Sequence, residues 1–535
     1  MLGFWRILEK LDSSVNGVVK KHERLYVYSC LFAVSVLAFC LRLWDCDKYP
    51  PLGGDMASDY LVSVHIINGV EYPIAQGFVF SPIMSYVRAF FINVFGVNTF
   101  VPLLPAVIFG TLAVIATFFL TREMYGQKVA LMASFLMSIN PISIWITHVS
   151  RFEDSVLFLC VLAIYLFYVA VEKGGKKWLL SLAGFVMGLA LQSHPVSLVL
   201  IPDMFVYLIF TRKLTKWLKD KYFWLAILLF LLAYSNIIYV NIENGMPLLS
   251  YWPHKLATPV LLEKNLNVQL VLDNYEVYFH TLSLMILLFE PFRVVLLYGW
   301  DAEIVFLLRL VNMAMFLGGF VFALDRREKG DILMLVMFAL PMILYPLLFF
   351  HTPNYYLSAL LPVLAILPAR LIREILKHSK TIFVRARTSK LAPRYTTKML
   401  TAFLSLIMVF LYVGHPVFLL NDTYNEYQLS GYSTASFVDV INFINRTADR
   451  TSITVVPIDL PVDLISYLTN DQLQPLVSEN LFSLKTISDI VNFELKNKVR
   501  DIYYIFFSQS VPSITLSTAT QEELLKRVHP GIQPM

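Results

Sequence analysis

The stretch that decides the fold is an apolar run, LYVYSCLFAVSVLAFCLRL (25–43), followed a few residues later by GGDMASDY (53–60). About 20 apolar residues cross a bilayer as one helix, so the run predicts a membrane span. The glycine pair suits a turn, and Asp55 and Asp59, four residues apart, would share one face of the helix that follows. Two carboxylates just outside a span predict a catalytic site at the membrane surface. The alternative is a solvated loop in which one aspartate caps a helix and the other lies on its surface.

The composition extends the membrane prediction to the whole chain. Of its 535 residues, 57% are hydrophobic and 15% are charged, whereas a soluble domain has about 25% charged residues. An apolar excess of this size requires lipid. The net charge of +5 does not indicate nucleic acid, because Lys and Arg fall almost entirely in short loops between apolar runs, where they orient the chain in the membrane.

Apolar runs predict an α-helical polytopic membrane protein with about eleven transmembrane helices. After 25–43, the expected spans are 100–120, 128–146, 155–171, 178–193, 195–210, 222–240, 302–324, 332–350, 355–370 and 399–419. Loops rich in Lys and Arg alternate with loops that are poor in them. The positive-inside rule therefore predicts a multi-pass protein of the cell membrane with a cytoplasmic N-terminus.

This topology divides the chain into three parts. Residues 1–24 form a cytoplasmic lead, residues 25–420 form the membrane domain, and residues 421–535 form a small extracytoplasmic α/β domain. The membrane domain has a first outer loop at 44–98 and a long outer loop at 241–300.

The first outer loop and the C-terminal domain carry local structure of their own. Two surface helices are expected in the loop, at 57–70 and 82–96, the second opening on Ser81 and Pro82. Alternating apolar patterns in the C-terminal domain predict two strands and four helices. These are strands Ser452–Ile458 and Ile502–Phe507 and helices Ser433–Ala448, Pro461–Leu468, Leu484–Leu495 and Ala519–Val528.

A second polar group lies on the same predicted outer side, where one span ends and the next begins. It contains His148, Arg151, Glu153 and Asp154. Charges at the edge of a membrane are costly and are usually functional. Arg151 can bind a phosphate with two hydrogen bonds, and Asp154 can hold a metal ion or orient an acceptor. The alternative for Asp154 is a structural role at a helix N-terminus, where the helix dipole favours a carboxylate.

Five further residues lie on that side, and two of them have two interpretations each. Arg88 is a snorkelling anchor or a phosphate clamp. His194, before a proline, is a turn residue or a ligand. His351, Asn354 and Tyr355 open the span near residue 355. Tyrosine is expected at the membrane interface, so only the histidine and the asparagine need another explanation.

The arrangement resembles the C-type glycosyltransferases, in particular the polyprenyl- or dolichyl-phosphate-sugar-dependent family that includes protein O-mannosyltransferases and aminoarabinose transferases. The resemblance covers residues 25–420. It is carried by the acidic motif after the first span, the two interfacial helices of the first outer loop, RFED (151–154), ALQSHP (190–195) and HTPNYY (351–356).

The resemblance implies the C-type glycosyltransferase fold and roles for several residues. Asp55 matches the catalytic aspartate of the first loop, and Asp154 matches the acid of the second. His194 falls where the family often has a phosphate-binding lysine or a histidine. Met56 stands where the family often has a second acid, so Asp59 is an alternative base.

The implied reaction moves a sugar from a polyprenyl- or dolichyl-phosphate donor to a glycan, lipid or protein acceptor on the outer face, with inversion. The acceptor hydroxyl needs a general base, Asp55 or Asp59, and Asp154 is the third catalytic candidate. The leaving phosphate needs positive charge, from side chains or from a divalent cation such as Mg²⁺ or Mn²⁺, with Asp154 as the candidate ligand. The expected substrate-binding residues are Arg88, His148, Arg151, Glu153, His194, His351, Asn354 and Tyr355.

Two other functions belong to different classes. A non-catalytic transporter or flippase of lipid-linked sugars would carry acids in the middle of the membrane. The predicted acids instead lie at one face, and Arg309 is an exception inside a predicted span. A receptor-like scaffold would leave the acidic first loop unexplained.

Overall fold

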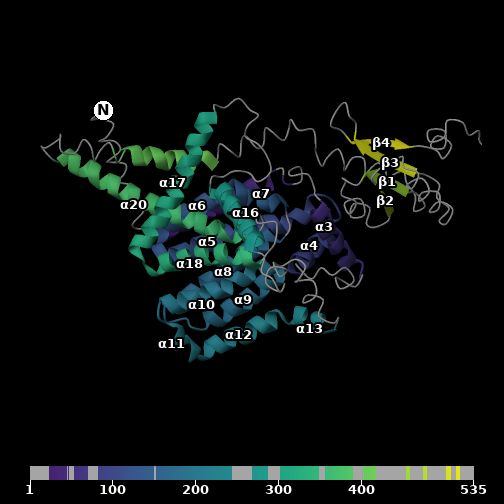
Figure 1. Ribbon diagram of the computed structural model, residues 1–535, viewed down its shortest axis with the longest axis horizontal. Coiled ribbons are helices and arrows are strands. Elements are labelled where there is room, and N and C mark those ends of the chain that lie inside the picture. The colour runs from purple at the N-terminus through teal and green to yellow at the C-terminus, as the bar shows by residue number, and fades with distance from the viewer. Residues whose placement is uncertain are drawn as a thin grey trace, which may run out of the picture.

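The body of the protein is a bundle of helices, shown by a computed structural model (Figure 1). The structure describes residues 23–44, 46, 54–69, 82–149, 152–243, 268–286, 302–348, 356–388, 401, 403–416, 453–457, 474–478, 502–507 and 514–518. The described residues of each predicted span are mostly helical.

The first half of the chain supplies most of the bundle. Its helices are α2 (Glu23–Leu43), α3 (Gly54–Ile67), α4 (Pro82–Phe95), η2 (Val101–Leu103), α5 (Leu104–Tyr125), α6 (Gln127–Ser138), α7 (Pro141–Val149), α8 (Glu153–Glu172), α9 (Leu179–Ser193), η3 (Pro195–Val199), α10 (Leu200–Phe210), α11 (Leu214–Leu218), α12 (Lys221–Ala233) and α13 (Ser235–Glu243). The second half adds α16 (Val268–Ile286), α17 (Ala302–Arg326), α18 (Lys329–Leu348), η4 (Leu357–Leu360), α20 (Leu361–Thr388) and a helix over Phe403–Pro416.

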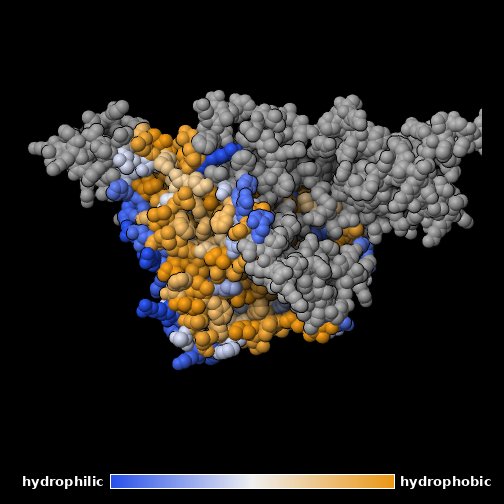
Figure 2. All heavy atoms as spheres, viewed as in Figure 1, coloured by the Kyte–Doolittle hydropathy of each residue, from blue (hydrophilic) through white to orange (hydrophobic). Residues whose placement is uncertain are grey.

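Several of these helices can cross a bilayer. Five described helices are long and apolar enough by themselves, and up to seven spans result if each of two bent pairs counts as one. Figure 2 shows a broad hydrophobic surface over the helical body, with hydrophilic residues gathered along one edge. The prediction of an α-helical multi-pass membrane protein is confirmed, while the number of spans and the orientation of the termini stay predictions.

The predicted span 128–146 is not one continuous helix. It consists of α6 and α7, which meet at an angle of 52°. Asn140 and Pro141 cause the break: proline disfavours helical backbone in the residue before it and suits the first position of a new helix. The Asn140 side-chain oxygen accepts a hydrogen bond from the Ser143 N–H at 2.9 Å and so caps α7.

The predicted span 222–240 is also broken, between α12 and α13, with a bend of 52°. Gln192 of α9 donates a hydrogen bond to the Ala233 carbonyl at the break and accepts one from Asn236 at 3.2 Å. A side chain that enters the hydrogen-bond ladder of a helix can bend it. Gly184 and Gly188 of α9 let the backbone of α12 approach closely.

Two regions are more helical than the sequence analysis expected. The long outer loop 241–300 contains α16, whose Asn274 and Tyr275 donate hydrogen bonds to the carbonyls of Pro346 and Ile343 in α18, at 2.6 and 2.7 Å. A search for apolar runs missed this helix because it contains polar residues, whose hydrogen bonds are satisfied by a neighbouring helix. In addition, α20 continues to Thr388, past the predicted end of its span at residue 370, because residues 371–388 contain neither glycine nor proline.

The C-terminal part contains a four-stranded sheet, drawn in yellow in Figure 1. Its strands are β1 (Ile453–Pro457), β2 (Gln474–Ser478), β3 (Ile502–Phe507) and β4 (Ile514–Thr518), in the order β2-β1-β3-β4. β1 pairs in parallel with β2 and β3, and β4 pairs antiparallel with β3. The two predicted strands are present, and β2 and β4 were not predicted. The four predicted helices lie outside the described residues.

Helix α8 organises the bundle. It is buried along nearly its whole length and packs against α5 and α9. Asp154 lies in its first turn and Glu172 ends it. The two residues are about 27 Å apart along the axis, which is close to the thickness of the hydrocarbon layer. The polar clusters described below gather at these two ends.

Candidate functional site

The acidic stretch 53–60 forms the beginning of α3, which starts three residues earlier than the predicted 57. Asp55 lies in its first turn and Asp59 one turn later, so the two residues follow each other on one helix as expected. The side chain of Asp55 is not among those described. Met56 and Tyr60 are buried and attach α3 to the main core.

Arg88 of α4 holds α3 against the beginning of α5. Its side chain is buried, and the guanidinium lies 4.9 Å from the centre of the Tyr60 ring. It donates hydrogen bonds to the carbonyl oxygens of Asp59 and Pro102, each at 3.3 Å. The Arg88 side chain therefore points into the protein, and its two hydrogen bonds fix the position of Asp59 relative to the residues just before α5.

Arg42, in the last turn of α2, was not predicted as a site residue. It is fully buried and donates to four oxygen atoms. The acceptors are the carbonyls of Ala38 at 3.2 Å, Ser138 at 3.4 Å and Met137 at 3.4 Å, and the Ser143 hydroxyl at 2.7 Å. The signal in the sequence was a charged residue inside an apolar run. The run was interpreted only as a membrane span that ends at Leu43, so Arg42 was not singled out.

Asp154 faces the same place from the first turn of α8. Its carboxylate is buried and accepts a hydrogen bond from the Thr147 hydroxyl at 2.9 Å. A Cβ atom placed on Gly110 of α5 would lie 2.6 Å from the Asp154 carboxylate, 2.8 Å from Arg42 Nε and 2.8 Å from the Thr147 hydroxyl. The glycine therefore leaves the space in which these polar groups meet.

His148 completes what we call the Asp154 cluster, defined as Arg42, Thr147, His148 and Asp154. Its Nε2 lies 3.1 Å from the carbonyl oxygen of Arg42. Glu153, beside Asp154, is also fully buried. The cluster thus joins the end of α2, the end of α7 and the start of α8.

His194 lies in an aromatic stack at the neighbouring end of α9. Its ring stacks on Phe152 with a centroid distance of 3.7 Å and on Tyr356 at 5.6 Å. Its Nδ1 accepts a hydrogen bond from the Val196 N–H at 3.2 Å and so caps η3. The turn role expected for this histidine is present, together with a position next to the first turn of α8.

The remaining predicted site residues lie outside the described residues. They are Arg151, His351, Asn354 and Tyr355. Within the described part of the chain, no group of three or more His, Cys, Asp or Glu side chains is placed to hold a metal ion.

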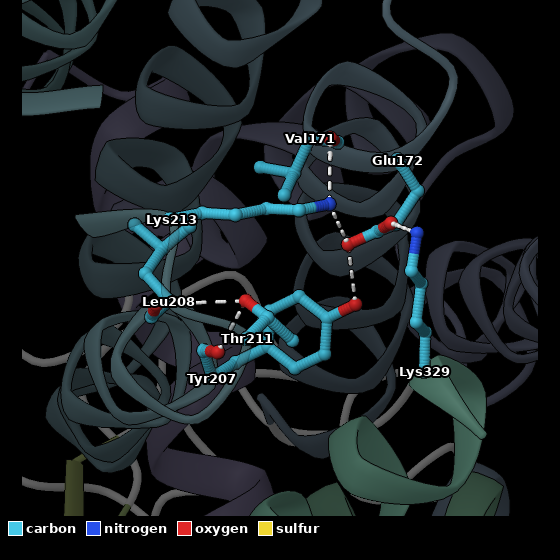
Figure 3. Close-up of polar contacts among 7 residues, drawn as sticks. All are labelled: Val171, Glu172, Tyr207, Leu208, Thr211, Lys213 and Lys329. Carbon is cyan, nitrogen blue, oxygen red and sulfur yellow. Dashed lines mark hydrogen bonds and ion pairs between the residues drawn. The ribbon is translucent and has the colours of Figure 1, made fainter. Parts of the chain in front are cut away.

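The opposite end of α8 carries the Glu172 cluster, defined as Glu172, Tyr207, Lys213 and Lys329 (Figure 3). The Glu172 carboxylate lies 2.6 Å from the Lys213 ammonium and 2.7 Å from that of Lys329. It also accepts a hydrogen bond from the Tyr207 hydroxyl at 2.8 Å. These contacts join α8, α10 and α18.

The sequence analysis expected the acids to lie at one face of the membrane. The structure instead has acids at both ends of the bundle. Asp203 of α10 is fully buried, and its carboxylate has no hydrogen-bond partner among the described residues. Asp331, at the start of α18, is fully buried in an ion pair with Arg370. Arg309 is thus one of several ionisable residues inside apolar helices.

Solved structures share this architecture. ArnT from Cupriavidus metallidurans, solved bound to undecaprenyl phosphate, aligns with a TM-score of 0.61 at 11% identity over 91% of this chain and 97% of that one. The archaeal oligosaccharyltransferase AglB from Archaeoglobus fulgidus, solved with an inhibitory peptide and a dolichol-phosphate, aligns with a TM-score of 0.55 at 14% identity, over 94% and 75% of the two chains. The fold is that of the C-type glycosyltransferases, which confirms the predicted resemblance.

Within that class the chain is similar to mannosyltransferases. Residues 80–239 match the family model described as dolichyl-phosphate-mannose-protein mannosyltransferase. The candidate mannosyltransferase YkcB of Bacillus subtilis is 23% identical over 232 residues, which is 43% of this chain and 32% of YkcB. YycA of the same organism, another candidate mannosyltransferase, is 26% identical over 133 residues, 24% of this chain and 19% of YycA. The chain thus spans about a third or less of the length of these relatives.

Proposed function

We propose that this protein is a membrane glycosyltransferase that moves a sugar from a polyprenyl- or dolichyl-phosphate donor to an acceptor hydroxyl, with inversion. The observation that supports the proposal is that the acidic helix α3 and the Asp154 cluster are both attached to the segment 102–110. Tyr60 of α3 and Val156 of α8 belong to one buried core. Arg88 ties Asp59 to Pro102 of η2, and the Asp154 cluster meets Gly110, about 12 Å further along η2 and α5.

The chemistry of such a site needs a base, a leaving group and an oriented acceptor. The acceptor oxygen attacks the anomeric carbon while the bond from that carbon to the phosphate oxygen breaks, and the lipid phosphate leaves with the electron pair. Asp55 takes the hydroxyl proton as general base, with Asp59 as the alternative, and Asp154 orients the acceptor. Attack from the side opposite the phosphate inverts the anomeric centre.

The donor follows from the chemistry and from similar proteins. ArnT and AglB were solved with undecaprenyl phosphate and a dolichol-phosphate, which are both isoprenoid phosphates. Arg151, two residues before α8 in the sequence, and His194, which stacks on Phe152, are the proposed contacts of the leaving phosphate, where positive charge stabilises the transition state. The remaining proposed contacts with donor and acceptor are Arg88, His148, Glu153, His351, Asn354 and Tyr355.

A divalent cation at Asp154 does not fit the described residues. The Arg42 guanidinium meets the Asp154 carboxylate over Gly110 and supplies positive charge where a cation would lie. In the described part of the chain, Asp154 belongs to no group of three or more His, Cys, Asp or Glu side chains that could hold a metal ion. We therefore derive no step through a metal.

The decisive experiment is Asp55→Asn in the full chain reconstituted in lipid nanodiscs with a radiolabelled polyprenyl-phosphate sugar. Sugar transfer should be abolished while insertion and the midpoint of thermal unfolding stay unchanged, because a neutral isostere removes only the base. Asp273→Asn, an exposed acid of α16, is the matched control and should keep full activity. Full activity of the Asp55 variant would rule out Asp55 as the base, and Asp59→Asn then tests the alternative.

A transporter or flippase of lipid-linked sugars is the competing class. It would move the labelled lipid across the membrane of a sealed vesicle without cleaving the bond between sugar and phosphate. Intact donor recovered from the opposite leaflet, with no free lipid phosphate formed, would exclude the enzyme. Release of lipid phosphate in step with acceptor labelling would exclude the transporter.

A further inference from the structure

Arg42 is a fully buried cation to which the proposed reaction gives no role. It lies in the last turn of a membrane-spanning helix, and all of its hydrogen bonds go to neutral oxygen atoms. No ion pair between described residues includes it. A cation buried at the edge of a membrane is costly unless its protons are satisfied, which makes its position informative.

The acceptors of Arg42 explain part of this position. Met137 and Ser138 are the last two residues of α6, and the carbonyls at the end of a helix have no partners within it. Ser143, whose hydroxyl accepts the shortest of the bonds at 2.7 Å, belongs to α7. One guanidinium therefore holds both sides of the break between α6 and α7.

The second part of the explanation is Asp154. Arg42 Nε and the Asp154 carboxylate both lie within 3 Å of the place that a Gly110 Cβ would take. Thr147, which donates to Asp154, belongs to α7, the same helix that Arg42 fixes. In addition, His148 Nε2 lies 3.1 Å from the backbone carbonyl of Arg42. Arg42 thus acts on Asp154 in two ways. Its positive charge lies near the carboxylate, and its hydrogen bonds fix α7, which carries Thr147.

We infer that Arg42 is a positioning residue for Asp154. The guanidinium fixes the broken helix that carries Thr147, and its charge faces the carboxylate without a direct ion pair, so the carboxylate remains available to an acceptor. The inference rests on the proposed function, in which Asp154 orients the acceptor. Arg42 would in turn hold Asp154 in place.

A double-mutant cycle tests it on the full chain in nanodiscs. Arg42→Met should lower kcat for transfer from the polyprenyl-phosphate donor about 30-fold with little change in the KM of the donor. In the Asp154→Asn background the same change should cost less than about threefold, because the residue through which Arg42 acts is already lost. Equal losses in both backgrounds would overturn the inference, since a residue that only supports the fold acts independently of Asp154.

Two other variants keep the test decisive if the methionine variant folds poorly. Arg42→Lys retains the charge but cannot reach four acceptors, so its kcat should lie between those of the wild type and Arg42→Met. Gly110→Ala places a methyl group among Arg42, Thr147 and Asp154 and should lower kcat without altering any charge. Wild-type kcat in both would overturn the inference.

Arg24→Met is the matched control. Arg24 lies at the other end of α2 and is exposed, so its removal should leave kcat unchanged. If the wild-type protein transfers no sugar from any isoprenoid phosphate, the proposed function fails. The coupling between Arg42 and Asp154 is then decided by the same cycle measured as midpoints of thermal unfolding. Non-additive shifts would support this coupling, and additive shifts would overturn it.

Discussion

The two ends of α8 use the same residue types in opposite ways. At one end, Glu172 is held by two lysines and a tyrosine hydroxyl. At the other end, Asp154 accepts one hydrogen bond from a neutral hydroxyl and takes part in no ion pair between described residues. Both carboxylates are nearly inaccessible to solvent, so exposure does not distinguish them.

The difference is in how completely each carboxylate is satisfied. A carboxylate with two ammonium partners and a hydroxyl is a structural tie, because its lone pairs are used and its contacts join α8, α10 and α18. A buried carboxylate with unused lone pairs costs stability and is characteristic of sites that bind or react. We therefore expect changes at the Glu172 end to alter stability and changes at the Asp154 end to alter activity.

The largest effect should come from Asp331→Asn, close to the Glu172 cluster. Asp331 is fully buried against Arg370 and also accepts a hydrogen bond from the Tyr125 hydroxyl at 3.0 Å. Breaking a buried ion pair from one side costs about 3 kcal/mol or more, because the other charge stays buried. The midpoint of thermal unfolding should fall sharply, while kcat per folded molecule stays within about twofold.

Asp325→Asn, an exposed acid of α17, is the control for that experiment and should leave the midpoint unchanged. A large loss of kcat in folded Asp331→Asn protein would show that the two ends of the bundle are not separate in function.

Asp154→Asn should show the opposite pattern. Loss of the group that orients the acceptor should lower kcat at least about 100-fold, or about 2.7 kcal/mol in the barrier. The free energy of unfolding should change by less than about 1 kcal/mol, because the lost attraction to Arg42 is offset by the removal of a buried charge. Initial rates and thermal unfolding of the same preparation check both parts. A variant that is unstable but fully active would reverse the comparison.

The sequence predicted the membrane architecture well because that architecture depends on local composition. A run of about 20 apolar residues is visible without knowledge of its neighbours. The breaks were missed because 128–146 and 222–240 remain apolar throughout, although Asn140 and Pro141 carried a readable signal. The break after α12 depends on Gln192, some forty residues away, which no local pattern reveals.

The candidate site was only partly predictable for the same reason. Asp55, Asp59 and Asp154 stood out as acids at the ends of apolar runs. Arg42 did not, because its acceptors Met137, Ser138 and Ser143 lie 95 to 101 residues further along the chain. Gly110 carried no signal in the sequence. It matters because it has no side chain at the place where the side chains of Arg42, Thr147 and Asp154 meet.

Glu172→Gln should have a moderate effect on stability. The amide keeps a hydrogen bond to Tyr207 but leaves Lys213 and Lys329 without their carboxylate. Their side chains are 23% and 59% exposed, so water replaces much of the lost interaction. We expect a loss of about 1 kcal/mol in the free energy of unfolding, with kcat unchanged. Lys329→Met should cost less than Lys213→Met, because the more exposed lysine contributes less. A reversed order would show that exposure does not set the contribution of each lysine.

A comparable or smaller effect should come from Asp220, in the loop before α12. Its carboxylate caps α12 by accepting a hydrogen bond from the Tyr222 N–H at 3.1 Å, and it lies 2.8 Å from the Lys177 ammonium. Asp220→Ala should cost about 1 kcal/mol at pH 7 through loss of the cap. Asp220→Asn should cost less, because an amide oxygen can still cap the helix.

The dependence on pH separates the cap from the ion pair. The hydrogen bond from Lys177 lowers the pKa of Asp220 below its ordinary value. A carboxylate whose pKa is lowered on folding adds stability above the unfolded pKa of about 3.9, and this contribution is lost as the pH falls through the folded value. The difference in unfolding midpoint between the wild type and Asp220→Asn should therefore be constant from pH 7 to about pH 5 and should shrink below about pH 4. A difference that persists in acid would mean that charge plays no part and that the asparagine is merely a poorer cap.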